Sequence, residues 1–285
     1  MAMNSDRKRS VLITGASSGI GRACALHMDR LGWQVFAGVR RKADAESLRR
    51  AASGRLTPVF LDVARPVEIR KAVRLVQKAT GEDGLSGLVN NAGVPYGGPV
   101  ELLDLDEVRH AFEVNFFGVI AVTQAFIPLL RRARGRIVNL SSISGLIVSP
   151  FLSPYTTSKF ALEALSDALR MELSPWNVRV ALIEPGAIDT PIWIKARDVA
   201  QGVLKNAPAG GLQLYGTAVD ALMRGLSQHG ISPEVVARAV AHALTAPHPR
   251  TRYPLGAEGP LVAVLRLLPD GLRDRLILAR LPKWG

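Results

Sequence analysis

A tyrosine and a lysine lie four positions apart in the segment SPYTTSKFALEAL, residues 153–165. Pro154 suits the first turn of a helix, and positions i and i+4 lie on the same face of a helix. The Tyr155 phenol and the Lys159 ammonium can therefore point at one place. A free phenol has a pKa of about 10, and a neighbouring positive charge lowers that pKa toward the range where a phenol can act as a base. The spacing alone favours a solvated helix face with a packed ring, and a general acid/base is the alternative that the rest of the sequence has to support.

A glycine-rich segment, TGASSGIG at 14–21, follows the apolar run SVLIT and precedes a helical pattern. Gly15, Gly19 and Gly21 allow the backbone to approach a ligand closely. The N-terminus of the following helix presents N–H groups and a partial positive charge, which suit a phosphate. The segment predicts a phosphate-binding loop, and the alternative is a tight strand-to-helix turn without a ligand.

Six apolar runs alternate with helical patterns, and these elements must position the residues above. Strands are expected at 10–14, 34–39, 56–63, 85–93, 135–142 and 178–186, and helices at 19–32, 43–52, 66–80, 106–133 and 154–175. Pro128 predicts a bend in the fourth of these helices. Strands that are apolar throughout are typical of a parallel sheet covered on both faces, which predicts an α/β fold with a doubly wound, Rossmann-type sheet in three layers. Ligands bind such sheets at the carboxyl ends of the strands.

The chain is expected to form a single domain with a C-terminal elaboration. A polar tail covers 1–9, a dinucleotide-binding core covers 10–188, and the last helix and strand of the core cover 231–258. The intervening segment 189–230 is rich in glycine and alanine, which predicts a lid over the substrate. An apolar and basic tail covers 259–285.

Several motifs together resemble the short-chain dehydrogenase/reductase family. They are the TGxxxGxG spacing of the glycine segment, NNAG at 90–93, Asn115 in EVNFFG, Ser142 thirteen residues before Tyr155, YTTSK at 155–159, and Pro185-Gly186 followed by Thr190. The resemblance covers about residues 10–255, and the C-terminal part looks like the branch that contains hydroxysteroid and retinol dehydrogenases. It implies an oxidoreductase that moves hydride between a nicotinamide cofactor and a carbonyl or secondary alcohol.

The resemblance also implies roles for individual residues. Tyr155 would be the general acid or base, Lys159 would hold the nicotinamide ribose, and Ser142 would hydrogen-bond the substrate oxygen. Asn115 would hold a water that links Lys159 to solvent as a proton relay. The residues expected at the cofactor are Gly15, Ser17, Ser18, Gly19, Ile20, Gly21, Arg40, Arg41, Asp62, Val63, Asn91, Ala92, Gly93, Tyr155, Lys159, Pro185, Gly186, Ile188 and Thr190.

The end of the second strand bears on the choice of cofactor. An acidic residue binds the adenosine ribose here in NAD-preferring relatives, whereas this chain has Val39, Arg40 and Arg41. A guanidinium can pair with a 2′-phosphate through a fork of donors. The sequence therefore predicts NADP(H) rather than NAD(H), and the alternative is that both arginines are solvated. Asp62 and the Val63 backbone are expected at the adenine.

The large residues of 189–230 are mostly apolar, which favours a lipophilic ketone or alcohol such as a steroid, a retinoid or a fatty compound. Three alternatives stay open. They are a non-catalytic NADP-sensing regulator with the same fold, an NAD-dependent dehydrogenase of a small polar alcohol, and a nucleotide-sugar dehydratase or epimerase. Chain length and glycine spacing disfavour the last of these.

The formal net charge is +12, and the positive residues are spread along the chain. No zinc-finger or RNA-binding signature accompanies them, so nucleic acid is not expected as a partner.

The five histidines do not pair at metal-binding spacing, which predicts no metal site. The single cysteine, Cys24, excludes a disulfide within the chain and fits a reducing compartment. The polar start does not look like a signal peptide, so a cytoplasmic location is expected.

Two surfaces predict contacts beyond the substrate. The helices at 106–133 and 154–175 are expected to pair copies of the chain into a homodimer or homotetramer. The tail segment 260–281 mixes apolar runs with arginines, and Pro269 is expected to divide it into two short helices. We expect this segment to cover the pocket, to contact a sister subunit or to lie on an anionic membrane as a peripheral anchor.

Overall fold

The computed structural model describes residues 8–207, 210–227, 230–279 and 281–282. Within them, seven parallel strands form one sheet in the order β3-β2-β1-β4-β5-β6-β7. The strands are β1 Ser10–Ile13, β2 Gln34–Val39, β3 Leu56–Phe60, β4 Gly87–Asn90, β5 Arg136–Leu140, β6 Arg179–Pro185 and β7 Arg252–Leu255. The strand order reverses between β1 and β4, so a crevice is expected at the carboxyl ends of these two strands.

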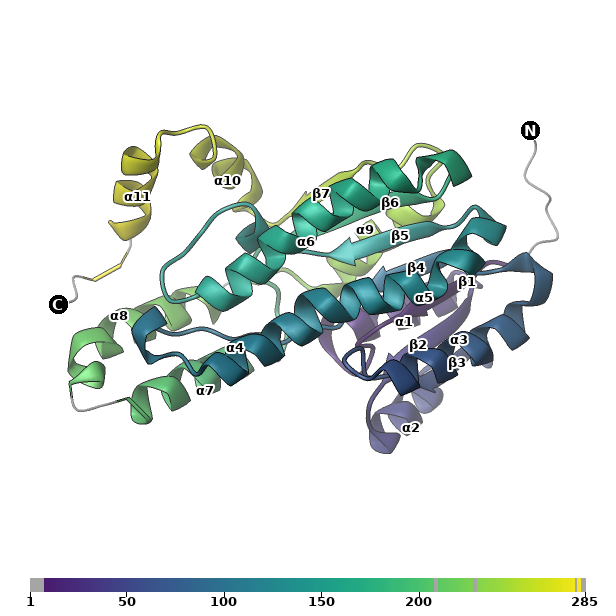
Figure 1. Ribbon diagram of the computed structural model, residues 1–285, viewed down its shortest axis with the longest axis horizontal. Helices are drawn as coiled ribbons and strands as arrows, with labels where there is room; N and C mark the ends of the chain where they lie inside the picture. Colours follow the sequence, from purple (N-terminus) through teal and green to yellow (C-terminus); the bar gives the residue numbers. More distant parts are fainter. Residues whose placement is uncertain (1–7, 208–209, 228–229, 280, 283–285) are drawn as a thin grey trace.

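Helices cover both faces of the sheet (Figure 1). One face carries α1 (Gly19–Arg30), α2 (Lys42–Ala51) and α9 (Pro233–Thr245), and the other carries α3 (Pro66–Thr80), α5 (Gly118–Ala133) and α6 (Ser153–Glu172). Successive residues of a strand point to opposite faces, so Val11 and Ile13 join one apolar core and Leu12 joins the other. Burial on both faces explains why the strands are apolar throughout. The predicted doubly wound α/β fold is confirmed.

The helix predicted over 106–133 is interrupted. It consists of α4 (Leu105–Phe112), a π-helical turn, η3 (Glu113–Phe117), and α5. Pro128 lies inside α5 without ending it, so the irregularity is not at the proline but at the turn that contains Asn115. A π-helical turn holds one residue more than an α-helical turn, and apolar periodicity does not reveal it.

The same stretch, Leu105–Ala133, is apolar enough to attract notice. Among the described residues, it is the one helix that could cross a membrane by length and composition, with a mean hydropathy of 1.6 in its most apolar window. Half of that window is buried inside the fold. Its buried side chains, Val122 and Phe126 among them, pack into the core under the sheet, as expected for the central helix of an α/β protein.

The segment 189–230 contains two helices, α7 (Ile192–Lys205) and α8 (Gly211–Ser227). They form a separate small core, in which Ala200 and Val219 are buried. The sequence predicts a lid here but not its two helices, because glycine and alanine obscure helical periodicity. These small residues instead allow the two helices to pack closely.

The C-terminal tail forms α10 (Gly259–Leu265) and α11 (Asp270–Leu278), divided before Pro269 as the sequence predicts. Helix α10 buries Val262 and Leu265, whereas α11 buries none of its residues. Figure 1 shows α11 in yellow, apart from the sheet. Four 3₁₀ turns complete the described elements: η1 Gly81–Asp83, η2 Val100–Leu102, η4 Ile143–Gly145 and η5 Ser174–Trp176.

Candidate active site

A cavity of about 210 Å³ lies along the carboxyl ends of the strands. Its walls are the loops that follow β1 to β6. It is lined by every residue predicted at the cofactor except Arg41, and by three of the four predicted catalytic residues, Ser142, Tyr155 and Lys159. The topology of the sheet thus gathers motifs that are widely separated in the sequence.

The loop between β1 and α1 has the geometry that a phosphate requires. Gly15 and Gly19 adopt φ angles of +66° and +53°, which residues with a Cβ rarely adopt. A Cβ on Gly21 would lie 2.3 Å from the Gly15 carbonyl oxygen, so a larger residue does not fit. Ser18 precedes α1 without a side-chain cap, which leaves the first N–H groups of the helix available for an anion. A dinucleotide phosphate therefore fits this end of the cavity.

Thr14 connects the glycine loop with the loop after β4. Its hydroxyl oxygen accepts hydrogen bonds from the N–H groups of Asn91 and Ala92, both at 3.0 Å. The Asn91 side chain donates to the carbonyl oxygens of Thr14 and Gly15, at 2.8 and 3.1 Å. These bonds fix the two sides of the crevice relative to each other. The sequence places Thr14 at the start of the TGxxxGxG motif, but sequence reasoning assigned it no role.

Ser142, Tyr155 and Lys159 meet at the other end of the cavity. Lys159 lies on α6, and its Nζ donates to the Leu140 carbonyl oxygen at the end of β5, 2.8 Å away. The same Nζ lies 5.6 Å from the centre of the Tyr155 ring, one turn earlier on the helix. The Ser142 hydroxyl donates to the Pro185 carbonyl oxygen at 3.2 Å, which anchors it to β6. The exposed fractions of Lys159 and Ser142 are only 6% and 5%.

Burial controls the protonation of the tyrosine and the lysine. It raises the pKa of Tyr155 to about 12, and the Ser142 hydroxyl opposes this change only in part. It lowers the pKa of Lys159 to about 8, and the negative charge of Glu163 opposes that change. In the protein without cofactor, the pKa of Tyr155 is therefore raised and not lowered toward 7, because desolvation disfavours the charged phenolate. A neutral phenol is a proton donor, which suits the reduction of a carbonyl.

Asn115 does not line the cavity. Its Oδ1 accepts from the Val94 N–H at 2.8 Å, and its Nδ2 donates to the Val94 carbonyl oxygen at 3.0 Å and to Ser158 Oγ at 3.2 Å. Both amide donors are therefore used within the protein. In this structure it fastens the loop after β4 to α6.

The two arginines after β2 have different surroundings. Arg40 lines the cavity. Arg41 does not, because its guanidinium binds the Asp44 carboxylate through Nε at 2.9 Å and NH2 at 3.1 Å. Asp62 lines the cavity, and its Oδ1 also accepts from the Ala64 N–H at 3.0 Å, which shapes the turn after β3. Arg40 is thus the arginine placed to meet a cofactor phosphate.

A small recess of about 10 Å³ opens beside Tyr155. Its walls are mainly apolar and include Leu152, Ile192, Ala196 and Met223. Since α7 supplies Ile192 and Ala196 and α8 supplies Met223, the helices of 189–230 reach Tyr155.

Comparison with known proteins agrees with this site. The sequence pattern of the short chain dehydrogenases matches residues 9–201. The chain belongs to the short-chain dehydrogenase/reductase family. It lies in the branch of that family that resembles the hydroxysteroid and retinol dehydrogenases.

Individual relatives of this short-chain dehydrogenase cover almost the whole chain. It is 39% identical to 17-beta-hydroxysteroid dehydrogenase type 6 of Bos taurus and 38% identical to retinol dehydrogenase 5 of Mus musculus, in each case over 96% of this chain and 89% of the relative. It is 34% identical to an NADPH-dependent 3-dehydrocapnine reductase of Ornithobacterium rhinotracheale, over 96% of this chain and 98% of the relative. A solved short chain dehydrogenase from Burkholderia cenocepacia J2315, in complex with NADP, has a TM-score of 0.74 at 26% identity, covering 95% of this chain and 98% of the other.

The contacts of Asn115 generate a prediction about stability. Replacing Asn115 with alanine leaves the Val94 N–H and carbonyl groups without their partner, which should lower the free energy of unfolding by about 1–3 kcal/mol. Asn206→Ala, at an exposed position, is the control and should change it by less than about 0.5 kcal/mol. Urea denaturation measures both values. Equal effects in the two variants would contradict the structural role given to Asn115.

Proposed function

We propose that this short-chain dehydrogenase is an NADP(H)-preferring oxidoreductase that transfers hydride between the nicotinamide and a carbonyl or secondary alcohol carbon of a lipophilic substrate. The observation that carries the proposal is the convergence of Ser142, Tyr155 and Lys159 at one end of a cavity whose other end suits a phosphate. Such a cavity can hold a dinucleotide with its reactive ring beside the acid/base residues.

The chemistry of each group follows from its surroundings. A nicotinamide bound in the cavity would supply or accept the hydride. In the direction of reduction, the substrate oxygen gains negative charge and requires a proton, which the neutral Tyr155 phenol can donate. The Ser142 hydroxyl, fixed by Pro185, can hydrogen-bond the same oxygen and stabilise its developing charge. Lys159 supplies a positive charge beside the phenol and a donor toward the ribose.

The preference for NADP(H) rests on Arg40, which lines the cavity where NAD-preferring relatives have an acidic residue. The names of two similar proteins, an NADPH-dependent reductase and a dehydrogenase in complex with NADP, support the same choice. The preference for a lipophilic substrate rests on the apolar recess beside Tyr155 and on relatives named for steroids and retinol.

Two alternatives differ from this proposal in testable ways. A non-catalytic NADP-sensing regulator would bind cofactor without transferring hydride, and it would not need the tyrosine and the lysine that this chain retains. An NAD-dependent dehydrogenase of a small polar alcohol would need polar groups beside Tyr155, where the recess is mainly apolar. Cofactor titration followed by a panel of ketones and alcohols separates these functions.

The C-terminal tail supports a cytoplasmic protein with peripheral membrane contact. Its side chains include Leu267, which is 85% exposed, and Val264, which is 58% exposed. Arg266, Arg273 and Arg275 lie among them. Apolar side chains flanked by arginines suit insertion into an anionic membrane, from which a lipophilic substrate can be drawn.

We also propose that the chain forms homo-oligomers through the outer face of α5 and α6. Phe117, at the end of the π-helical turn, is 52% exposed, and Phe160 on α6 is 41% exposed. Large exposed rings on adjacent helices of one face favour contact with a second copy.

Loss of the phenol hydroxyl tests the catalytic assignment. Tyr155→Phe keeps the ring but removes the proton donor, so turnover should fall by about 10²- to 10⁴-fold. The melting temperature and the dissociation constant of NADPH should change little, because the ring still fills its place. A phenylalanine variant that retains more than half of the parent turnover on the true substrate would remove Tyr155 from its role.

A charge reversal at Arg40 tests the cofactor assignment. Arg40→Asp should weaken NADPH binding by about 10- to 100-fold, because it removes a charge-assisted phosphate contact, and should change NADH binding far less. Arg41→Asp makes the same change of net charge at a residue that lies outside the cavity, and it should have a much smaller effect. Isothermal titration measures the affinities of the parent and of both variants for NADPH and for NADH. Equal affinities of the parent for NADPH and NADH would contradict the preference.

Flotation with liposomes tests the membrane contact. At low salt, the full chain should float with anionic vesicles and not with neutral ones, since each basic residue near the surface contributes about 1 kcal/mol. The double variant Leu267→Glu/Leu272→Glu should lose this binding, whereas Val100→Glu/Leu105→Glu, which makes the same charge change at exposed sites outside the tail, should keep it. Equal binding of the two double variants would show that the tail is not responsible.

A further inference from the structure

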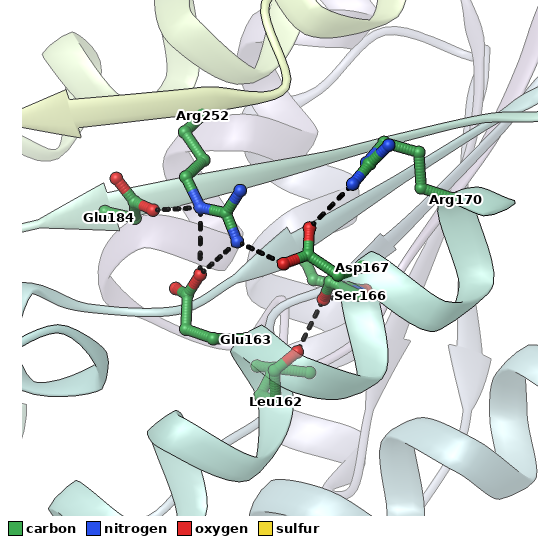
Figure 2. Close-up of polar contacts among 8 residues, drawn as sticks. Leu162, Glu163, Ser166, Asp167, Arg170, Glu184 and Arg252 are labelled. Atoms are coloured by element: carbon green, nitrogen blue, oxygen red, sulfur yellow. Dashed lines mark hydrogen bonds and ion pairs between the residues drawn. The ribbon is translucent and has the colours of Figure 1, made fainter.

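A cluster of charged side chains lies where α6, β6 and β7 meet (Figure 2). Arg252 of β7 is at its centre. Arg252 Nε lies 3.2 Å from Glu184 Oε1, and its NH2 lies 3.2 Å from Glu163 Oε2 and 2.9 Å from Asp167 Oδ2. Glu163 and Glu184 are only 7% and 1% exposed. In the described part of the chain, Arg252 is the one basic residue that forms an ion pair with either of these buried carboxylates.

Glu163 connects this cluster with Lys159. It follows Lys159 by one turn of α6, so the two side chains share a face of the helix. The absence of a side chain at Gly145 allows the packing, since a Cβ there would lie 2.8 Å from Ser141 Oγ and 3.1 Å from Glu163 Cγ. Ser141 itself stands between Leu140, whose carbonyl binds Lys159 Nζ, and the catalytic Ser142. The carboxylate therefore lies against the strand end that holds the lysine.

Glu184 connects the cluster with Ser142. It precedes Pro185, whose carbonyl oxygen accepts the Ser142 hydroxyl at 3.2 Å. A displacement of the Glu184 side chain would move this acceptor through the shared backbone of β6. Arg252 thus contacts the immediate supports of both the lysine and the serine, although it does not line the cavity itself.

We propose that Arg252 is a positioning residue for the reaction: its ion pairs with Glu163 and Glu184 keep Glu163 negatively charged beside Lys159 and hold the strand end that anchors Ser142. This inference rests on the proposed function, which assigns the chemistry to Lys159 and Ser142. Arg252 acts only through these supports and contacts neither the cavity nor the reacting groups.

The loss of Arg252 should change the pKa of Lys159 in a definite direction. Burial raises the pKa of Glu163, against the effects of the Ser141 hydroxyl and Arg252. Burial and the charge of Glu163 raise the pKa of Glu184 to about 7, against Arg252 and the more distant Arg266 of α10. Without Arg252, the pKa of each carboxyl should rise further and favour its protonated form, because an unpaired buried charge is costly. Lys159 then loses the attraction of Glu163, and its pKa should fall below about 8.

The charges that face this cluster are few. They are Lys159, Asp167 and Arg170 of α6, Arg252 of β7 and Arg266 of α10, besides the two glutamates. Arg170 pairs with Asp167 at 3.1 Å and forms no ion pair with either glutamate. Arg170→Met is therefore the matched control for Arg252→Met, since both variants remove an arginine that binds Asp167.

Competitive labelling with acetic anhydride measures the titration of Lys159 in the protein without cofactor, with mass spectrometry as the readout. The parent should show a midpoint near pH 8. Arg252→Met should lower that midpoint by about one unit, and Arg170→Met should leave it unchanged. On the active enzyme, Arg252→Met should reduce kcat by up to about 100-fold with a smaller change in the KM of the substrate, because it misplaces the catalytic groups.

Two further variants keep the proposal testable if Arg252→Met does not fold. Glu163→Gln preserves the ion pairs of Arg252 with Glu184 and Asp167, and it should shift the Lys159 midpoint in the same direction. Arg252→Met/Glu184→Gln removes one charge of each sign and should recover part of the lost kcat. The proposal is overturned if the Lys159 midpoint stays at the parent value in both Arg252→Met and Glu163→Gln. If Arg252→Met does not fold, an unchanged midpoint in Glu163→Gln alone overturns it. The labelling of Lys159 needs no substrate, so it tests the role of Arg252 without a hydride-transfer assay. Failure of the proposed function would instead appear as a parent protein that transfers no hydride.

Discussion

The hydrogen bond from the Lys159 ammonium to the Leu140 carbonyl oxygen joins the catalytic helix to the end of a central strand. A lysine that is 6% exposed can stay there only if its charge has partners, and this carbonyl is the partner within hydrogen-bond distance. The bond sets the height of α6 above the sheet, and with it the position of Tyr155 one turn before. It also fixes the strand end from which Ser142 reaches the cavity. The acid/base groups are therefore placed by the fold itself, before a cofactor binds.

Burial that places these groups also opposes their ionisation. The phenol is held neutral and the ammonium is destabilised, so the site without cofactor favours proton donation over proton abstraction. The negative charge of Glu163 partly restores the positive charge of the lysine, and Arg252 keeps that glutamate ionised. An oxidised nicotinamide, which is positively charged, would stabilise a phenolate further. The charges around α6, and not the Tyr–Lys pair alone, therefore influence the protonation state of Lys159.

The sequence predicts the sheet well, because six strands buried on both faces leave continuous apolar runs with glycine or polar residues at their ends. It also predicts the residues of the cavity, since each motif lies directly after a strand or, for Tyr155 and Lys159, on the helix α6. It does not predict the π-helical turn at Asn115, because one extra residue in a turn leaves no periodic signal. It does not predict the Arg252 cluster either, because Glu163 and Arg252 are 89 positions apart and come together through the packing of α6 on β6 and the pairing of β6 with β7. The sign of the pKa change at Tyr155 depends on burial, which spacing along a helix does not determine.

Transfer of an isotopic label tests the central claim most directly. The protein is incubated with NADPH that carries deuterium at the transferable position of nicotinamide C4, together with steroid, retinoid and fatty carbonyl compounds. The account predicts an alcohol product with deuterium on the former carbonyl carbon for at least one lipophilic compound, and a slower reaction with labelled NADH. Tight binding of NADPH without transfer of deuterium to any compound, lipophilic or polar, would contradict the account and favour a cofactor-sensing protein.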